Sequence, residues 1–408
     1  MKDTAMATLR KLHILVIAPT PFFSDRGTHI RILEEALALE QLGHTVTIAT
    51  YHIGKDILAV LGSRIDVRRI RRLLFWYKKL EAGPDWQKII LDLLLIKKTL
   101  FLARTKRPDI IHGHLHEGVL IGWVVQKILF WRNIKLVGDF HGSLVKEMVS
   151  HAYLGQGVLR KVFRRVENFI DNLGDAAVTS SWENTEEIGR IREGKPTETL
   201  LDGVRLEMFR SSSDRDALRD RYGIPRKKTV IAYTGALIPN KGISFFLDAI
   251  PLVAEKHPEA HFVIAGFPRE KIESYLSTGV FRERMTVISP LSYFVLPEVL
   301  AMADIGVDPK EAEVKQASGK LLQYMGAGLP VACFDTKNNR KYLGEGGWYA
   351  QDTSAAGLAD VIGVMLGDTS ELKRRGGMNR ERAERFTWKE SARALERIYE
   401  RLSEVSGG

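Results

Sequence analysis

The chain has 408 residues, 45% of them hydrophobic and 27% charged, with a formal net charge of +10. This composition excludes a largely disordered chain, and the length suits two α/β domains of about 150–200 residues each. The single cysteine, Cys333, excludes an intramolecular disulfide and a cluster of zinc-binding thiolates, which indicates a reducing compartment. Cys333 lies in an apolar run and is predicted to be a core residue.

The positive charge is concentrated in the first half of the chain. Residues 1–205 contain 31 Lys and Arg against 23 Asp and Glu, whereas the remaining residues contain 29 and 27. Such a field attracts polyanions, whether nucleic acid, anionic lipid or phosphorylated substrates. The N-terminus lacks the apolar stretch of a secretory signal, and polar residues interrupt the most apolar window, Leu115–Phe130. We therefore expect a cytoplasmic protein that does not span a membrane.

The first 50 residues predict a βαβ unit. A buried strand over His13–Ala18 is followed by a loop that contains Gly27 and Thr28. A helix then ends at Gly43, and a second strand covers Thr45–Ala49. Units of this kind build parallel sheets.

Further short apolar runs predict buried strands in both halves of the chain. In chain order they are Arg107–His112, Ile134–His141, Ala176–Ser180, Thr229–Gly235, His261–Ala265, Met285–Ile288, Ile305–Val307 and Pro330–Phe334. The polar segment Ser211–Pro225 separates the two sets and predicts a linker with an entry helix. The fold class predicted is α/β, with two Rossmann-like parallel-sheet domains that face a central cleft.

The predicted domains cover residues 1–205 and 206–385, and residues 386–408 form a helix expected to pack back on the N-terminal domain. Within the first domain, a helix is predicted to bury one apolar face and to turn basic residues outward. The apolar residues are Val162, Phe163, Val166, Phe169 and Ile170, and the basic residues are Arg160, Lys161, Arg164 and Arg165.

The segment Lys310–Pro330 carries the clearest chemistry. A helix is predicted to begin at Ser318-Gly319-Lys320 and to end at Gly328. Its free N–H groups, its dipole and Lys320 favour an anion, which predicts a diphosphate site. From these residues alone, an ordinary capped helix is an equally good interpretation.

A second candidate anion site is the loop Gly235–Gly242, in which Lys241 precedes a helix near Ile243. The loop lacks the Gly-x-Gly-x-x-Gly spacing, and no Gly-x4-Gly-Lys-Ser/Thr motif occurs. These absences argue against a nicotinamide dehydrogenase and a P-loop ATPase.

These motifs, in this order, resemble the retaining GT-B glycosyltransferases of the glycosyl transferase group 1 family. The shared pieces are Gly27-Thr28, Gly43–Val46, Pro108–His114, Phe140–Gly142, Ala176–Ser181, Asp202–Val204, Gly235–Gly242, Val263–Gly266, Ala303–Pro309 and Lys320–Val331. Each piece is weak alone, but the ordered set spans essentially the whole chain and is specific.

The resemblance implies transfer of a sugar from a nucleotide-diphosphate sugar to a hydroxyl acceptor, with no metal and no other cofactor. It assigns acceptor binding to the N-terminal domain and donor binding to the C-terminal domain. The catalytic residues it implies are His141, Lys241 and Lys320. The donor-binding residues it implies are Gly27, Gly235, Lys241, Gly266, Ser318, Gly319, Lys320, Leu321 and Gln323, and further candidates are Thr28, His114, Glu117, Glu311 and Glu313.

The chain departs from the family at the two glutamates of its Glu-x7-Glu pattern, where it has Lys315 and Gln323. Ala236 also replaces an arginine of the family, and Glu311 or Glu313 would reach the sugar only from a shifted loop. The alternatives are a non-catalytic partner subunit of the same fold and a nucleotide-sugar epimerase or phosphorylase.

His112, His114 and His116 alternate, so a strand would place them on one face as a metal site requires. The sequence offers no clear carboxylates to complete such a site, and the family needs none, so we expect no metal there. His44 and His257 are predicted to lie at the surface.

The segment Arg68–Lys79 mixes basic and aromatic residues. It predicts a membrane-facing or acceptor-binding patch on the inner face of the membrane, for a lipid-linked or cell-surface glycan precursor. A solvated basic helix is the main alternative. Nucleic-acid binding is not expected because no recognition module accompanies the segment.

Overall fold

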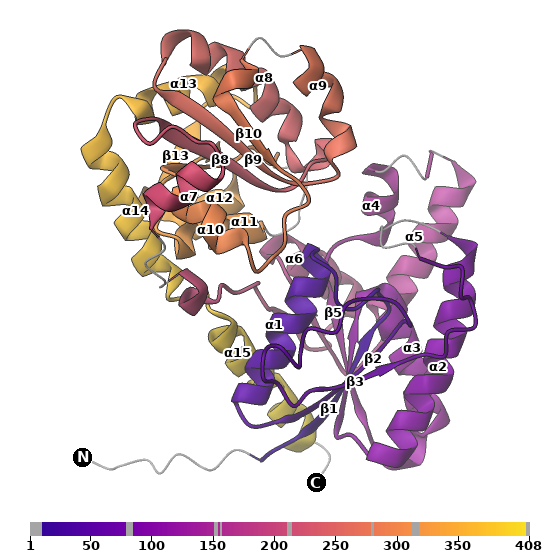
Figure 1. Cartoon of the computed structure of the whole chain (residues 1–408). Helices are drawn as coiled ribbons and strands as arrows, with labels where there is room; N and C mark the ends of the chain where they lie inside the picture. The colour runs from indigo at the N-terminus through magenta and orange to yellow at the C-terminus, as the bar shows by residue number, and fades with distance from the viewer. Residues whose placement is uncertain are drawn as a thin grey trace, which may run out of the picture. The chain divides into compact units, whose positions relative to one another are not determined.

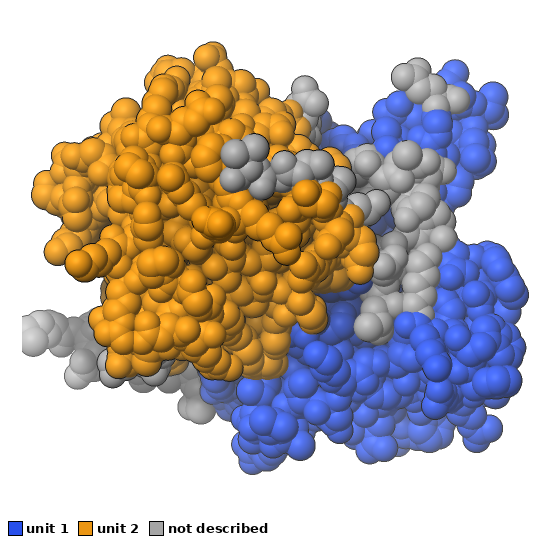
Figure 2. All heavy atoms as spheres, turned by 45° about the horizontal axis from the view of Figure 1, so that its top comes forward, with its two compact units in different colours: residues 1–201, 391–408 blue, residues 202–390 orange. Residues whose placement is uncertain are grey.

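The computed structural model describes residues 10–78, 85–150, 154–155, 157–209, 214–278, 281–311 and 318–404. The chain divides into two compact units, shown in different colours in Figure 2. Unit 1 comprises residues 1–201 and 391–408, and unit 2 comprises residues 202–390.

Unit 1 is built on a seven-stranded sheet in the order β3-β2-β1-β4-β5-β6-β7, in which all neighbours are parallel. The strands are β1 His13–Ala18, β2 Thr45–Thr50, β3 Asp66–Arg69, β4 Ile110–His114, β5 Lys135–Phe140, β6 Ala176–Thr179 and β7 Thr197–Thr199. The central strand β1 pairs with both β2 and β4. It is almost entirely apolar because its side chains are buried on both faces of the sheet.

Helices cover both faces of this sheet (Figure 1). They are α1 Gly27–Gln41, α2 Trp86–Lys106, α3 Leu115–Ile128, α4 Leu144–Ser150, α5 Val158–Asp171, α6 Trp182–Arg192 and α15 Trp388–Glu404. The alternation of side chains along β4 separates the two faces. Ile111 packs in the core with α2 and α3, whereas His112 faces α1 and α15.

Unit 2 has a six-stranded sheet in the order β10-β9-β8-β11-β12-β13, again parallel throughout. Its strands are β8 Thr229–Ala236, β9 Ala260–Phe267, β10 Met285–Ile288, β11 Ile305–Asp308, β12 Val331–Phe334 and β13 Gly347–Ala350. Its helices are α7 Arg215–Arg221, α8 Ile243–Lys256, α9 Glu273–Thr278, α10 Leu296–Met302, α11 Gly319–Gly326, α12 Lys337–Leu343, α13 Ala355–Leu366 and α14 Thr369–Ala383. Residues such as Phe246, Phe262 and Ile362 fill a core between the sheet, α8 and α13.

Both sheets reverse their strand order once, between β1 and β4 in unit 1 and between β8 and β11 in unit 2. Loops leave in opposite directions at such a point and open a crevice beyond the carboxyl ends of the strands. The prediction of two Rossmann-like parallel-sheet domains is thus confirmed. Cys333 lies fully buried in β12, as predicted.

Two basic segments differ from what their sequence patterns suggested, the first in the alternative of a solvated basic helix and the second in the burial of its apolar face. Residues 68–78 are not a helix, because Arg68 and Arg69 belong to β3 and pair with β2, and the residues after them lie in turns and loops; Lys79 lies outside the described residues. In α5 only Ile170 of the five apolar residues is buried, and Val162, Val166 and Phe169 are exposed. The pattern of α5 is amphipathic, but the structure leaves most of its apolar face uncovered.

One face of the C-terminal helix α15 packs on unit 1 and buries both apolar and polar side chains. Leu395 and Tyr399 are fully buried, and His44 Nε2 lies 3.0 Å from the Glu396 carboxylate. His44 also accepts a hydrogen bond from Leu12 N through Nδ1. The predicted surface position of His44 is wrong, because α15 covers it. No helix among the described residues has both the length and the apolar composition needed to cross a bilayer.

We predict that Leu395→Ala lowers the unfolding free energy of unit 1 by about 2–5 kcal/mol, because it opens a cavity under α15. Thermal unfolding followed by circular dichroism measures the loss. Arg397→Ala on the exposed side of the same helix is the control and should shift stability by less than about 0.5 kcal/mol. Equal melting temperatures for Leu395→Ala and the parent would show that α15 is dispensable for unit 1.

Candidate functional site

The predicted donor loops meet at the β8–β11 reversal in unit 2. Gly242 has φ +78°, and a Cβ on it would lie 1.9 Å from the carbonyl oxygen of Pro309. Only glycine permits this backbone contact, which holds the turn containing Lys241 against the loop that follows β11. Gly235, at φ +120°, lies at the end of β8 near the side chain of Lys320.

Lys320 lies at the start of α11 and points into this site. Its Nζ is 3.4 Å from Asp308 Oδ1 and 3.9 Å from the ring centroid of Tyr233. Within the described part of the chain, neither Lys320 Nζ nor either carboxylate oxygen of the fully buried Asp308 has a hydrogen-bond partner. Each buried polar atom left unpaired costs about 1–3 kcal/mol, which favours a site built to hold a polar ligand.

Two further polar atoms at α11 are buried without a hydrogen-bond partner among the described residues, namely Ser318 Oγ and Gln323 Oε1. Ser318 is the N-cap residue of α11, but its side chain makes no capping hydrogen bond. The N–H groups of the first helical turn are therefore not capped by Ser318, and an anion is their natural partner.

Lys310 is a residue of this site to which the sequence assigned no role. Its side chain is buried directly after β11, and its pKa lies well below the ordinary value. Burial is the main cause, and the positive charges of Lys241 and Lys320 add to it, while Asp308 and Asp202 oppose it. Its position in the sequence could have identified it. A lysine two residues after a buried strand next to the strand-order reversal lies at the carboxyl-terminal edge of the sheet, where ligands bind in such folds.

Other predicted donor residues have different surroundings. Gly266 lies near the end of β9, and a Cβ there would lie 1.7 Å from the carbonyl oxygen of Gly235, so it permits close packing of β9 on β8. Leu321 is fully buried, so only its backbone is available to a ligand. Glu311 is described, whereas Glu313 and Lys315 lie outside the described residues.

In unit 1, the predicted residues gather at the carboxyl ends of β4 and β5. His141 Nε2 lies 3.2 Å from His114 Nδ1 and 3.5 Å from Asp139 Oδ2. Gly27 and Thr28 begin α1, whose Arg31 forms a buried ion pair with Asp139 at 2.8 Å. The structure thus brings His141, His114 and the start of α1 into one region of unit 1.

Glu117 and His116 lie in α3 and face other partners. Glu117 accepts a hydrogen bond from Lys88 Nζ at 2.9 Å, and this lysine lowers its pKa against the effect of burial. His116 Nε2 lies 3.2 Å from Asp171 and 4.0 Å from Glu167. Of the three alternating histidines, His112 and His114 share one face of β4, whereas His116 does not, because β4 ends at His114.

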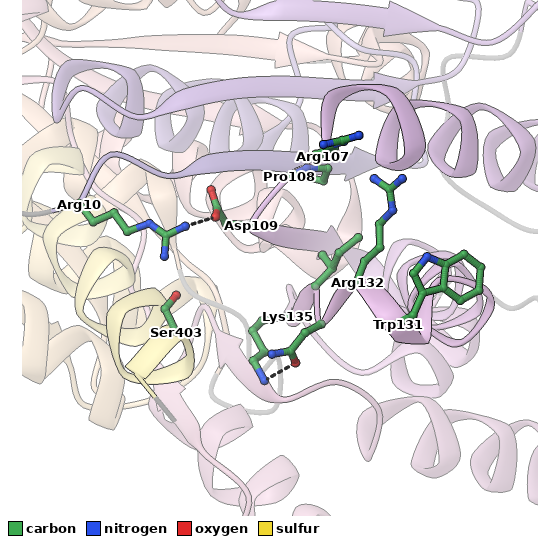
Figure 3. A pocket seen from close by; sticks show the side chains of 10 residues that line it. Arg10, Arg107, Pro108, Asp109, Trp131, Arg132, Lys135 and Ser403 are labelled. Atoms are coloured by element: carbon green, nitrogen blue, oxygen red, sulfur yellow. Dashed lines mark hydrogen bonds and ion pairs between the residues drawn. The ribbon is translucent and has the colours of Figure 1, made fainter. Parts of the chain in front are cut away.

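Unit 1 also has a hollow of about 560 Å³ at the amino ends of β4 and β5, drawn in Figure 3. It is lined by basic residues, among them Arg10, Arg132 and Lys135, and Arg10 pairs with Asp109 at 2.7 Å. This hollow lies at the edge opposite the carboxyl ends of the strands. It is therefore separate from the predicted acceptor region of unit 1.

Comparisons with known proteins show that the chain is similar to glycosyltransferases. The family model for glycosyl transferases group 1 matches residues 228–368, and that for glycosyltransferase family 4 matches residues 26–207. A D-inositol 3-phosphate glycosyltransferase of Corynebacterium glutamicum is 25% identical over 405 residues, covering 91% of each chain.

Two solved structures share the fold of the chain. Sucrose-phosphate synthase from Thermosynechococcus elongatus has a TM-score of 0.78 at 18% identity, over 97% of this chain and all of the other. The Anabaena protein HepE, in complex with UDP-glucose, has a TM-score of 0.74 at 15% identity, over 95% of this chain and 99% of the other.

The fold and the family-model matches together identify a glycosyltransferase of the GT-B type, with two Rossmann-like domains. The two family models between them span most of the sequence. Residues 228–368 match the glycosyl transferases group 1 model and residues 26–207 match the glycosyltransferase family 4 model, and a retaining mechanism is consistent with both matches.

We predict that Lys310→Met raises the melting temperature of the unliganded protein and weakens binding of nucleoside diphosphates about tenfold or more. The folded state holds the Lys310 proton less firmly than the unfolded state, whose ordinary pKa is 10.5, so stability rises with pH up to that value. The stability advantage of the variant should therefore shrink as the pH approaches 10.5. A lost charge-assisted hydrogen bond costs about 1.5–3 kcal/mol of binding.

Differential scanning fluorimetry across pH, with UDP, GDP and ADP, measures both effects. Lys256→Met, at an exposed position of α8, is the matched control and should change neither quantity. Unchanged nucleotide affinity in Lys310→Met would remove Lys310 from the site.

Proposed function

We propose that the protein transfers a sugar, with retention of configuration, from a nucleotide-diphosphate sugar to an acceptor hydroxyl. The observation that carries this proposal is the convergence of three lysines, Lys241, Lys310 and Lys320, at the strand-order reversal of unit 2. The uncapped start of α11 adds oriented N–H groups to the same site. HepE, which shares the fold, was solved with UDP-glucose, and this supports a nucleotide-sugar donor.

Catalysis would rest on stabilisation of the departing diphosphate. Lys320, Lys241 and the N–H groups of α11 would meet the negative charge as the bond between the sugar and the phosphate oxygen breaks. The acceptor oxygen would form its bond on the same face of the sugar, and its proton would pass to an oxygen of the leaving phosphate. This front-face course needs neither a carboxylate nucleophile nor a metal. His141 would contribute at a hydroxyl of the transferred sugar.

We predict that Lys241→Ala and Lys320→Ala each reduce the rate of sugar transfer at least about a hundredfold, in line with the loss of one charge-stabilising group in a transition state. Both variants should remain folded by circular dichroism. Hydrolysis-corrected transfer from radiolabelled nucleotide sugars measures the rate, and Lys373→Ala on the exposed side of α14 is the control. Near-normal rates in both variants would refute the site.

One observation favours a second candidate, a non-catalytic partner subunit. Gln323 stands where the family has its second glutamate, and its Oε1 is buried without a hydrogen-bond partner among the described residues. A thermal-shift screen against uridine-, guanosine- and adenosine-diphosphate sugars separates the candidates. Stabilisation by none of them would support the non-catalytic role.

The acceptor is proposed to be a lipid-linked or cell-surface glycan precursor at an anionic membrane surface on the cytoplasmic side. The uncovered face of α5 supports this proposal. Its exposed apolar residues are Val158, Leu159, Val162, Val166 and Phe169, and its basic residues are Arg160, Lys161, Arg164 and Arg165. An amphipathic helix of this kind suits the boundary between headgroups and acyl chains.

We predict that Val162→Glu and Phe169→Glu, combined, reduce binding to vesicles at least about tenfold, since each buried apolar side chain contributes about 1.5–3 kcal/mol. Co-sedimentation with phosphatidylcholine vesicles, with and without phosphatidylglycerol, measures the binding. Val364→Glu replaces an exposed valine of α13 and should leave vesicle binding unchanged. Full binding by the α5 variant would refute the membrane role of this helix.

A further inference from the structure

Unit 1 contains a fully enclosed cluster of ionisable side chains at the carboxyl ends of β4 and β5. Glu35 comes from α1, His112 and His114 from β4, and Asp139 from β5, and none of them is more than 2% exposed. The ligand atoms that these four residues offer lie within 4.8 Å of one another.

The two histidines present their Nε2 atoms to one carboxylate. Glu35 Oε1 lies 3.5 Å from His112 Nε2 and 3.8 Å from His114 Nε2. The rings are stacked, with centroids 4.6 Å apart, because positions two apart on a strand share a face. Among the described residues, neither Nε2 atom has a hydrogen-bond partner, and neither does Glu35 Oε2.

The opposite ring nitrogens are held by outer groups. His112 Nδ1 lies 2.5 Å from the hydroxyl of Tyr399, which α15 supplies. His114 Nδ1 lies 3.1 Å from Asp139 Oδ2 and 3.2 Å from His141 Nε2, and Arg31 pairs with Asp139. Metal-binding histidines are oriented in this way, since a partner on one nitrogen leaves the lone pair of the other directed at the ion.

The spacing also suits a small tetrahedral ion. Zinc bonds of about 2.0–2.1 Å to nitrogen and oxygen place neighbouring ligand atoms about 3.3 Å apart. The observed separations from Glu35 Oε1, 3.5 and 3.8 Å, need only a small contraction to reach this value. Arg31 pairs with Asp139 at 2.8 Å and with Glu35 Oε2 at 3.9 Å, whereas Glu35 Oε1 faces the histidines and is the oxygen that would bind an ion.

The neighbouring cluster of His116, Glu167 and Asp171 provides a contrast within the same unit. There, His116 Nε2 has Asp171 at 3.2 Å, and Glu167 accepts hydrogen bonds from Ser143 at 2.7 Å and Arg164 at 2.9 Å. Its polar atoms are satisfied by the protein, whereas the inner atoms of the first cluster are not.

We propose that Glu35, His112 and His114 bind a zinc ion, with Asp139 and Tyr399 as the outer groups that orient the histidines. The proposal departs from the expectation, drawn from the sequence, that these histidines bind no metal. The ion would join α1 to β4 and, through Tyr399, to α15, and would thereby stabilise unit 1. Its ligands all lie in unit 1, and the transfer step proposed above does not require the ion.

The test is the metal content of the full-length protein. Protein expressed with supplemental zinc is treated with a chelator and separated from it by gel filtration. It should retain one zinc ion per chain by mass spectrometry. When the ion is removed, the midpoint temperature of the first unfolding transition should fall. Protein refolded with cobalt should show the visible absorption of a tetrahedral site. Absence of stoichiometric zinc and of the cobalt spectrum in the parent protein would overturn the proposal.

Variants locate the site. Glu35→Gln and His114→Gln should lower zinc affinity at least a hundredfold in competition with a chelating dye, while His116→Gln should bind zinc as the parent does. Zinc retained at full affinity in both cluster variants would overturn the assignment. The cobalt measurement on the parent decides the question if either variant fails to fold.

Discussion

The proposed donor site depends on a single backbone contact, the approach of Gly242 to the carbonyl oxygen of Pro309. This contact joins the turn after β8 to the loop after β11, and these are the two strands between which the sheet of unit 2 reverses its order. A side chain at residue 242 would separate the two loops and move Lys241 away from the site. The convergence of lysines is therefore a consequence of strand order and of one residue without a Cβ.

Sequence patterns predicted the framework of both units well. Ten predicted strands, among them His13–Ala18 and Met285–Ile288, are present within a few residues, because continuous apolar runs between turn residues identify buried parallel strands. The helix start at Gly319 was also predicted, since glycine, lysine and the following apolar pattern are local features. The edge strands β3, β7 and β13 were missed. All three are short, and β3 and β7 contain few apolar residues.

Features that depend on distant parts of the chain were not predictable. His44 resembles a surface residue until α15, more than 350 positions away, covers it. The apolar face of α5 resembles a core face, and only the tertiary structure shows that most of it is uncovered. Lys310 is an ordinary basic residue in the sequence, and its lowered pKa comes from burial beside Lys241 and Lys320, which the fold alone brings together.

The polar clusters of the two units favour ligands of opposite charge. In unit 2, buried lysines and uncapped N–H groups raise the free energy of the unliganded state, and an anion lowers it. In unit 1, two imidazole Nε2 atoms that have no hydrogen-bond partner among the described residues face the Glu35 carboxylate, and a cation would lower the cost of burying them. Buried polar atoms without partners are uncommon in folded proteins, so each cluster indicates the charge of its missing partner. For unit 2, the proposed partner is the diphosphate of a sugar donor, which would arrive and leave with every transfer. In unit 1, the enclosure of the cluster by α1 and α15 favours an ion that stays bound and contributes to folding.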